Sequence, residues 1–429
     1  MSTLKLPDGP QTHPWIQTFQ WLASPLEYME ACAKRYGDIF ILRIGPVFTP
    51  QVIISNPQAI QEIFGTDPKQ LDSGEEAGIK SPMIGRQSML TLAGERHRRH
   101  RKLLMPPFHG ERMRTYGQLV LNITDQVTER WAIGEPFSVR SSMQAISFQV
   151  ILKAVFGLEE GSRYEKLQER LLVRLNPKMP LLEALMFLFP ALQQDLGSWS
   201  PWGQFMHQLR QIDELIYAEI AERKEQLDPS RSDILSLMMA ARDEQGQPMT
   251  DVELRDELMT LLLAGHETTA TSLSRALYWI HHLPHVREKL LLELDTLGEN
   301  PDPNTILRLP YLNAVCQETL RIYPVAVGAL NRVVKSSLQI GGYQFEPGTL
   351  LIPSIYLTHH REDLYPQAKQ FKPERFLERQ FAPYEYLPFG GGNRTCIGMA
   401  FAQFEMKLVL ATVLSRYQLE LADSKPMQA

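Results

Sequence analysis

The stretch Phe389–Gly398, FGGGNRTCIG, decides the fold of this 429-residue chain. Its three consecutive glycines let the backbone bend sharply or approach a flat group closely. Residues 399–417 have the apolar spacing of a helix, which places Cys396 just before a helix N-terminus. The helix dipole and the free amides there favour a thiolate, the form of cysteine that binds metal. Cys396 is therefore either a metal ligand or a buried, inert cysteine beside a tight turn, and the inert cysteine is the commoner case.

A metal at Cys396 would need an unusual ligand set, because no second Cys or His stands at ligand spacing. The thiolate would be the sole protein ligand of a group that brings its other ligands, and haem iron held by a Cys thiolate fits that description. The glycines do not indicate a nucleotide site, because no clear strand precedes them and no Gly-Lys-Ser/Thr follows.

A long helix is predicted upstream of this loop. Thr250 and Glu253 match a capping box, in which the Thr hydroxyl and the Glu carboxylate satisfy free amides of the first turn. The helical pattern continues to Leu283, so roughly 33 residues at ~1.5 Å each would span ~50 Å. A helix of this length must pass through the protein and be apolar on most faces.

The middle of this helix, Ala264–Thr269 (AGHETT), departs from the apolar pattern. Its Gly costs ~1 kcal/mol relative to Ala in a helix interior, and Thr268 and Thr269 can bond to carbonyls one turn earlier and bend the helix. Either Glu267 and the threonines face a polar groove between helices, or the helix opens locally to admit a small ligand and to relay protons. A zinc protease is excluded, because HExxH needs a second His where Ala270 stands.

The composition is that of a soluble globular protein. Apolar residues make up 44% and charged residues 22%, which excludes a disordered or fibrous chain. The net charge of −5 does not suit a nucleic-acid binder. Three distant cysteines exclude a disulfide framework and fit a reducing cytosol. No apolar run reaches the ~18–20 residues that a bilayer needs, and the N-terminus lacks the apolar core of a signal peptide. We therefore expect a soluble, cytoplasmic protein without a transmembrane segment.

The chain is predicted to form one mainly α domain, residues 1–429, with a small antiparallel β portion. Residues 1–20 are expected to be an extended lead-in, because four Pro and Gly residues fall within the first fifteen. Residues 38–45 and 51–55 predict a β-hairpin, and residues 338–356 predict further antiparallel strands. Most of the remainder has helical spacing, and no repeat or low-complexity linker divides it.

Glu318 and Arg321 stand three residues apart in a predicted helix and can pair on one face. Arg375 would add a second guanidinium to the same carboxylate, a geometry suited to bidentate bonding. Spacing alone equally allows an ordinary surface ion pair.

These segments together resemble the cytochrome P-450 superfamily. Phe389–Gly398 matches its FxxGxRxCxG signature at every fixed position, and Ala264–Thr268 resembles its (A/G)Gx(D/E)T segment. Glu318–Arg321 is its ExxR pair, and Phe371–Phe376 (FKPERF) resembles its PERF segment. The motifs stand in the family's order, and within the family the chain resembles the cyanobacterial fatty-acid and terpene hydroxylases. The resemblance implies a cytochrome P-450 fold that forms a single haem domain, with the long central helix crossing over the haem.

The resemblance also implies roles for individual residues. The cofactor would be haem b, with O2 as co-substrate, and Cys396 would bind the iron. Glu267 and Thr268 would be the catalytic pair that delivers protons. Glu318, Arg321 and Arg375 would form a structural brace behind the haem. Further cofactor contacts would come from the basic stretch at residues 96–102 and from the motifs: His97, Arg101, Ala264, Arg332, Phe389, Arg394 and Gly398.

The implied function is a haem-thiolate monooxygenase that hydroxylates an apolar substrate, a fatty acid or a terpenoid. The apolar residues expected to line its substrate pocket are Leu263, Ala264, Ala326, Val327 and Ala329. Three alternatives stay open: a haem sensor or gas carrier, a peroxide-using peroxygenase, and a structural helical protein without a cofactor.

The chain has no flavin or iron–sulfur motif, so its electrons are expected from a ferredoxin or flavodoxin with a reductase. Arg98, Arg99 and Lys102 project away from the helix face that carries His97 and Arg101, and a basic rim there would attract an acidic partner. We expect a monomer. Only 12 residues follow residue 417, fewer than is usual in the family, so the C-terminal strands are expected to be truncated or unusually short.

Overall fold

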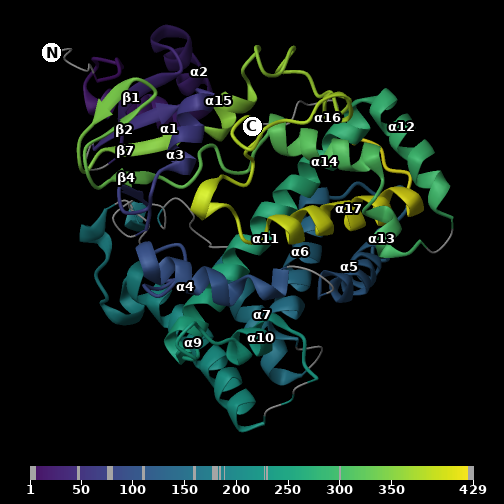
Figure 1. The fold of residues 1–429 in the computed structure, drawn as a ribbon. Coiled ribbons are helices and arrows are strands. Elements are labelled where there is room, and N and C mark those ends of the chain that lie inside the picture. Colours follow the sequence, from purple (N-terminus) through teal and green to yellow (C-terminus); the bar gives the residue numbers. More distant parts are fainter. Residues whose placement is uncertain are drawn as a thin grey trace.

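The computed structural model describes residues 6–45, 49–74, 81–108, 112–157, 161–175, 182, 185–187, 189–226, 228, 230–298 and 301–423. Figure 1 shows a sheet-bearing part, which holds the N-terminal helices, beside a larger helical body. The last long helix, α17 (Met399–Arg416), crosses the front of the helical body in this view. The chain is thus mainly α with a small β portion, as predicted.

The larger sheet has the strand order β1-β2-β7-β4-β3. Its strands are β1 (Ile39–Arg43), β2 (Pro50–Ile54), β3 (Leu71–Asp72), β4 (Arg332–Val334) and β7 (Leu350–Pro353). β1 and β2 form the predicted antiparallel hairpin, with Ile39 opposite Ile54. β2 and β7, however, run parallel, with Val52 opposite Leu351. The prediction of a purely antiparallel β portion was therefore wrong. The two parallel strands come from distant parts of the chain, and the long connection between them lets both run in one direction.

A separate hairpin joins β5 (Leu338–Ile340) to β6 (Tyr343–Phe345) in antiparallel register. Gly341 and Gly342 form its turn with φ values of 56° and 82°, a left-handed backbone that favours glycine. This part of the predicted β-rich zone is confirmed.

The N-terminal region differs from the predicted lead-in. Residues 6–13 contain no helix or strand, but α1 (Pro14–Ala23) is a helix, so an extended chain up to residue 20 was wrong. Pro14 occupies the first helical position, where its missing N–H is not needed and its fixed φ suits a helix. The first five residues of the lead-in lie outside the described part. The next helices are α2 (Pro25–Tyr36), as predicted, and α3 (Pro57–Gly65).

The helical body contains most of the remaining elements. Its α-helices are α4 (Gly94–Leu104), α5 (Arg112–Thr128), α6 (Val139–Phe156), α7 (Ser162–Leu175), α9 (Pro201–Glu225), α10 (Ile234–Ala240), α11 (Asp251–His282), α12 (Pro284–Leu294), α13 (Pro303–Ile306), α14 (Pro310–Ile322) and α17; α15 (Ile355–His359) and α16 (Arg375–Glu378) are short. The 3₁₀ turns are η2 (Pro106–Phe108), η3 (Pro190–Leu192), η4 (Gly197–Trp199), η5 (Asp295–Leu297) and η6 (Gly392–Arg394). None of the described helices has the length and apolar character needed to cross a membrane.

Helix α11 is the predicted long central helix, with 32 residues. Its capping box is present: Glu253 N–H donates to Thr250 Oγ1 (3.2 Å), and Thr250 N–H donates to Glu253 Oε2 (2.7 Å). The helix packs against α6, α9, α14 and α17, so it is surrounded by the helical body. It is apolar on most faces because it runs through the largest core cluster.

Candidate cofactor and active site

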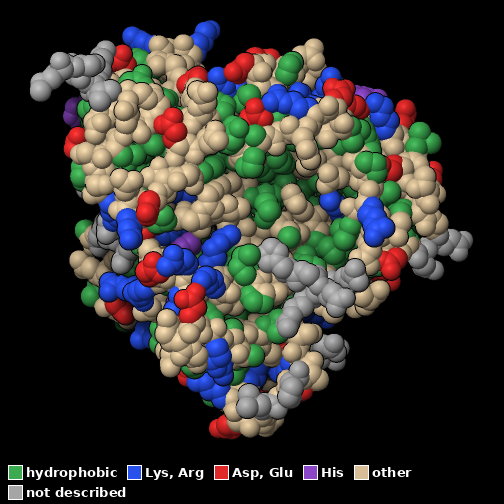
Figure 2. Space-filling model, in the orientation of Figure 1, with side chains coloured by type: hydrophobic (Ala, Val, Ile, Leu, Met, Phe, Trp, Pro, Cys, Tyr) green, Lys and Arg blue, Asp and Glu red, His purple; other side chains and the backbone are tan. Residues whose placement is uncertain are grey.

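A cavity of about 320 Å³ lies where α11 meets α4, the segment after α14 and the loop before α17. Its walls are mostly apolar, and Figure 2 shows apolar side chains gathered in the middle of this face of the molecule. Helix α11 contributes one continuous stripe to the wall, in which successive residues are one or three positions apart: Glu257, Thr260, Leu261, Ala264, Gly265, Thr268, Thr269 and Ser272. The cavity therefore opens along the central helix, beside the two segments that the sequence singled out.

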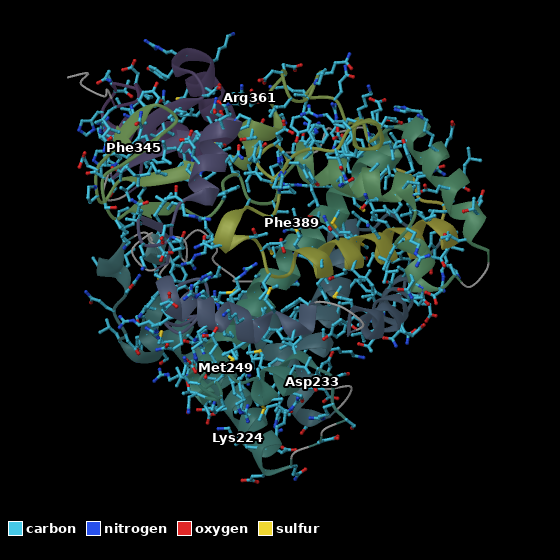
Figure 3. The ribbon with its side chains drawn as sticks, viewed as in Figure 1. Lys224, Asp233, Met249, Phe345, Arg361 and Phe389 are labelled. Carbon is cyan, nitrogen blue, oxygen red and sulfur yellow. The ribbon has the colours of Figure 1, made fainter. Side chains whose placement is uncertain are left out.

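The glycine loop has a shape that only small residues allow. Gly390 and Gly392 have φ values of 67° and 64°, and a Cβ on Gly391 would stand 2.0 Å from the Phe64 ring. Cys396 N–H donates to Phe389 O (2.9 Å), which closes the loop. The side chain of Phe389, labelled near the centre of Figure 3, lines the cavity. The glycines thus let the loop fold tightly against α3.

Cys396 lies just before α17, as predicted, and its Sγ faces the cavity. The other cysteines, Cys32 and Cys316, are buried elsewhere. Cys396 itself is exposed at the cavity, but the surrounding protein atoms desolvate its sulfur and raise the pKa of the thiol, while the Gly398 N–H and Arg101 oppose this shift. The backbone amide of Gly398 favours the thiolate, as expected at this helix terminus, but desolvation of the sulfur acts in the opposite direction and is the larger effect without a bound group. A bound metal cation would supply the missing charge, since a coordinating thiol is deprotonated outright.

His97 and Arg101 point from α4 into the cavity, as their spacing predicted. The His97 ring is buried, and burial, with help from the charges of Arg394 and Arg101, lowers its pKa to about 3. The ring is therefore neutral near neutral pH and can donate from one nitrogen. Arg101 Nη1 donates to Thr395 O (2.7 Å), so α4 is tied directly to the cysteine loop.

Arg394 is buried at the cavity wall and paired with Asp72 (2.9 Å). Its other donors reach three backbone carbonyls, of Met89 (3.0 Å), Ser73 (3.3 Å) and Leu92 (2.8 Å). Its Nε has no partner among the described residues. An arginine with one buried, unused donor beside a cavity can bind an anionic group of a ligand.

Arg332, the remaining predicted cofactor contact, lies behind the loop and is absent from the described cavity wall. Its guanidinium is buried and donates to Ser73 Oγ (3.0 Å), Leu330 O (2.6 Å) and Gly391 O (3.1 Å). Burial lowers its pKa to about 10. In this conformation Arg332 fixes the glycine loop to β4, and its contact with a cofactor stays a prediction.

Glu267 and Thr268 are neighbours in sequence, but they face different surroundings. Thr268 lines the cavity, and its hydroxyl donates to Ala264 O (2.6 Å). The Glu267 carboxylate pairs with Arg140 and accepts from Gln144 Nε2 (2.9 Å), both on α6. The structure therefore places the alcohol of the predicted pair at the cavity and the acid outside its wall.

Three of the predicted substrate contacts, Ala264, Ala326 and Ala329, line the cavity. Leu263 and Val327 are not part of the cavity wall, and their contact with a substrate stays a prediction. Leu263 falls off the cavity-facing stripe of α11, because its neighbours on that stripe recur every three or four residues. Val327 packs against a core cluster formed by residues of α2, β1, β2 and α15. The predicted contact Gly398 also lines the cavity.

The predicted brace is present and buried. Arg321 forms two bonds with Glu318 (2.7 and 2.8 Å), and Arg375 Nε donates to the same carboxylate (3.1 Å). Arg321 Nη1 also donates to the carbonyl of His359 (2.7 Å). His359 Nε2 accepts from Leu387 N–H (2.9 Å), so this histidine connects the brace to the segment before the cysteine loop. The brace thus ties α14 to the segments that lead into the cysteine loop, and the surface-pair alternative is excluded.

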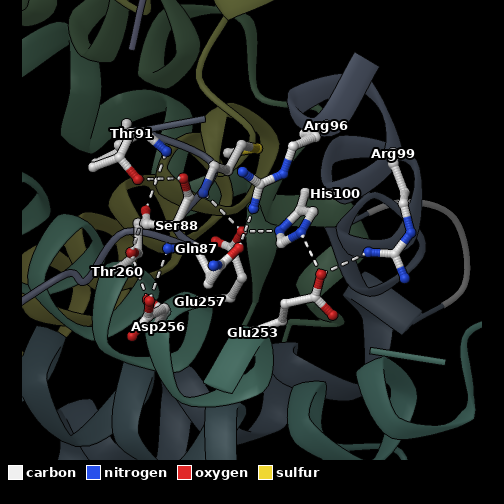
Figure 4. Close-up of polar contacts among 12 residues, drawn as sticks. Gln87, Ser88, Thr91, Arg96, Arg99, His100, Glu253, Asp256, Glu257 and Thr260 are labelled. Atoms are coloured by element: carbon white, nitrogen blue, oxygen red, sulfur yellow. Dashed lines mark hydrogen bonds and ion pairs between the residues drawn. The ribbon is translucent and has the colours of Figure 1, made fainter. Parts of the chain in front are cut away.

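The sequence reasoning missed Glu257, His100 and Thr260. Figure 4 shows them in a polar network between α4 and α11. Glu257 is buried and lines the cavity, and His100 lies behind it. One signal was available: Glu257 lies seven residues before Ala264, on the same stripe of the central helix.

A second cavity, of about 510 Å³, lies between α7 and α9. It is lined mainly by charged side chains, and these pair with one another: Arg223 with Glu219 (2.7 Å) and Asp233 (2.5 Å), and Arg163 with Glu219 (2.7 Å). None of the motif residues lies there. It is therefore separate from the candidate active site.

The outer face of α4 is less basic than its sequence suggested. Arg99 binds Asp243 (2.6 Å) and Glu253 (2.8 Å), while Arg98 pairs with Glu95 and Lys102 with Glu244. Arg98 and Lys102 remain 64% and 60% exposed, whereas Arg99 is only 26% exposed. Arg99 is therefore a structural cation, and only the other two are available to a partner.

Comparisons with known proteins show the family of this chain. The family model for cytochrome P450 matches residues 7–429. Mycobacterial relatives include a protein of Mycobacterium bovis named as cytochrome P450 135B1, 34% identical over 97% of this chain and 86% of the relative. A protein of Mycobacterium tuberculosis named as cytochrome P450 135A1 is 33% identical over 98% of this chain and 90% of the relative. The solved structure of retinoic-acid-bound cyanobacterial CYP120A1 matches with a TM-score of 0.81, at 26% identity over 96% of this chain and 92% of that one.

Proposed function

This chain belongs to the cytochrome P450 family and is a haem-dependent monooxygenase, and we propose that it hydroxylates a lipid-like substrate, a fatty acid or a terpenoid. The observation that carries this proposal is the apolar cavity between Cys396 and the central helix. Lipid chains suit such a wall, because their binding depends on removing apolar surface from water.

The residues around the cavity fit haem b. Cys396 lines the cavity and is the one cysteine in its described wall. Within the described ranges, no group of three or more His, Cys, Asp or Glu side chains could hold a metal ion. Arg394 offers a buried, unused Nε donor, and His97 and Arg101 stand beside it for the two propionates. When bound, the haem iron with its thiolate ligand activates O2 for insertion into a C–H bond.

We assign the remaining steps to this chain's own residues. Cys396 holds the iron, and the apolar wall keeps bulk water away from the reacting centre. Thr268 orients a proton donor at the cavity, because its hydroxyl oxygen faces the ligand space while its proton is held by Ala264 O. Glu267 supplies protons to Thr268 from outside the wall through water, once it is released from Arg140. The brace of Glu318, Arg321 and Arg375 holds the cysteine loop in position.

The substrate class is supported by two observations. Ala264, Ala326 and Ala329 give the cavity an apolar wall of small side chains, which leaves room for an extended or branched chain. The neighbour CYP120A1 was solved with retinoic acid, an apolar terpenoid chain that ends in a carboxylate.

We assign electron supply to a separate ferredoxin or flavodoxin with its reductase. The contact Arg101–Thr395 places α4 against the cysteine loop, so the exposed Arg98 and Lys102 lie on the same side of the molecule as the iron ligand. Cations at that surface attract the acidic face of a small electron carrier.

The test of the proposal is spectroscopic and then catalytic. The reduced protein should show the red-shifted carbon-monoxide band of a thiolate-bound haem. Cys396→Ser should abolish this band, while Cys32→Ser and Cys316→Ser should retain it. Incubation with a ferredoxin, its reductase and NAD(P)H should then hydroxylate a fatty acid or terpenoid that shifts the haem spin state. Product formed with hydrogen peroxide but not with reductant would identify a peroxygenase, and no product under either condition would identify a sensor or carrier.

A further inference from the structure

Glu257 is part of the cavity wall, and one of its carboxylate oxygens has no partner among the described residues. Its Oε1 accepts from Met89 N–H (2.7 Å) and lies 2.7 Å from His100 Nδ1. Its Oε2 has no partner among the described residues, although the side chain is buried and belongs to the cavity wall. A buried polar atom without a partner destabilises a protein by ~1–3 kcal/mol, so a ligand that bonds to it recovers that loss.

His100 holds Glu257 in this position. Its ring stands between two carboxylates, with Nδ1 facing Glu257 and Nε2 facing Glu253 Oε1 at 3.1 Å. Each of these contacts needs a proton between nitrogen and oxygen, so the three side chains share at least two protons. Arg99 binds the far carboxylate, Glu253, at 2.8 Å, and Figure 4 shows the chain running from Arg99 to Glu257. Oε1 is therefore anchored from two directions, and Oε2 is left without a partner among the described residues.

The neighbouring polar groups are already satisfied. The hydroxyl of Thr260, one turn further along α11, contacts both Asp256 O (2.7 Å) and Ser88 Oγ (2.7 Å). Asp256 accepts from Gln87 N–H (2.9 Å) and pairs with Arg255 (2.9 Å). These groups stabilise the segment before α4, whereas the free oxygen of Glu257 serves no such contact among the described residues.

We propose that Glu257 Oε2 is a polar subsite that binds the hydroxyl group of an otherwise apolar substrate. The inference rests on the proposed function and narrows its substrate from a fatty acid or terpenoid to a neutral, lipid-like alcohol. A hydroxyl can donate to an ionised carboxylate and accept from a protonated one, so it pairs with Glu257 in either state. A free fatty acid, by contrast, brings a carboxylate next to Glu257, and two like charges in one buried site disfavour each other.

The experiment compares three ligands that share one chain: dodecan-1-ol, its methyl ether, and dodecanoate. Binding to the haem-loaded protein is followed by the spin-state shift at pH 8. In the wild type the alcohol should bind ~10-fold more tightly than the ether, because only the alcohol donates a hydrogen bond. Glu257→Leu should abolish this preference. Glu257→Gln should keep part of it, since an amide also accepts, and should bind dodecanoate more tightly than the wild type does.

Glu405→Gln is the matched control. Glu405 is also fully buried with unpartnered carboxyl oxygens among the described residues, but it does not appear in the cavity wall. This variant should keep the wild-type preference for the alcohol.

An equal preference in the wild type and Glu257→Leu would overturn the inference, as would tightest wild-type binding of dodecanoate. Faster haem loss from Glu257→Leu with the preference intact would assign Glu257 to the cofactor, and this would also overturn the inference. Tight binding of all three ligands without discrimination would leave the proposed function standing and remove only the subsite. No binding of any of the three by a protein with the carbon-monoxide band would contradict both.

Discussion

The carboxylate of Glu267 on α11 is paired with the guanidinium of Arg140 on α6, outside the cavity wall. The next residue, Thr268, lines the cavity and makes its hydrogen bond within α11. Two residues that follow each other in the sequence therefore have different surroundings: Thr268 faces the cavity, and Glu267 faces α6. Under the proposed function, the Thr268 hydroxyl would meet the ligand directly, whereas the Glu267 carboxylate would act only through movement or water.

Thr268→Ala should separate oxygen use from product formation. The variant should keep the carbon-monoxide band and bind ligand within ~threefold, but its product per NAD(P)H should fall by ~10-fold or more, with hydrogen peroxide released instead. Glu267→Gln should have the smaller effect of the two. Ser274→Ala is the control, because the Ser274 hydroxyl also bonds within α11 (2.8 Å, to Ala270 O) but does not line the cavity. Unchanged product per NAD(P)H in Thr268→Ala would contradict the role.

Glu318→Gln should destabilise the protein strongly. The substitution leaves Arg321 and Arg375 without their counter-ion in a buried site, a loss of ~3–5 kcal/mol. The measurement is the midpoint of thermal unfolding together with haem retention. Arg98→Ala removes a solvent-exposed ion pair and should change stability by less than ~0.5 kcal/mol. Equal effects of the two substitutions would show that the brace is dispensable.

Glu405 should make stability fall as pH rises. Complete burial raises the pKa of its carboxyl from 4.5 to about 8, so the folded protein keeps a proton that the unfolded chain releases. Stability from this group is therefore present below about pH 4.5 and is lost progressively up to about pH 8. The stability of Glu405→Gln relative to wild type should rise by up to ~1.4 kcal/mol per pH unit in that window. Parallel profiles of the two proteins from pH 5 to 8 would rule this out.

Charge reversal on α4 should test the docking surface. Arg98→Glu with Lys102→Glu should slow reduction by a ferredoxin at low salt and flatten its dependence on ionic strength, because long-range attraction is lost. Reduction by dithionite should stay normal. Arg210→Glu changes an equally exposed arginine on α9 and should have little effect. An unchanged ferredoxin rate in the double variant would exclude this face. Arg99 is left intact because its two ion pairs are structural.

The sequence predicted the local elements well where one residue type has one structural use. The capping box of α11 and the hairpin at Gly341 and Gly342 follow from short-range spacing, and the structure contains them. The buried brace at Glu318 was implied by the family resemblance, because spacing alone also allowed a surface ion pair. Pro14 shows the limit of such rules, since proline both excludes a helix interior and starts a helix. The parallel pairing of β2 and β7 depends on the path of the chain between them, which no local pattern contains.

The sequence motifs predicted where the candidate site lies, but they predicted less well which residues form the cavity wall. Ala264 and Ala329 line the cavity, but Val327 turns away, because the direction of a side chain in an extended segment depends on tertiary contacts. Glu257 carried no motif at all. Its importance arises from an imidazole on another helix and from the amide of Met89, both of which reach it only in the folded chain.

Met89 links two parts of the site through a single residue. Its N–H donates to Glu257, and its carbonyl accepts from Arg394, two residues before the cysteine. A displacement of Met89 that breaks its hydrogen bond to Glu257 would also distort its hydrogen bond with Arg394, so the two contacts depend on each other. A ligand that displaces Met89 would therefore also weaken the hydrogen bond from Arg394 to the Met89 carbonyl. Under the proposed function, haem binding at Arg394 and substrate binding near Glu257 would therefore be coupled through Met89.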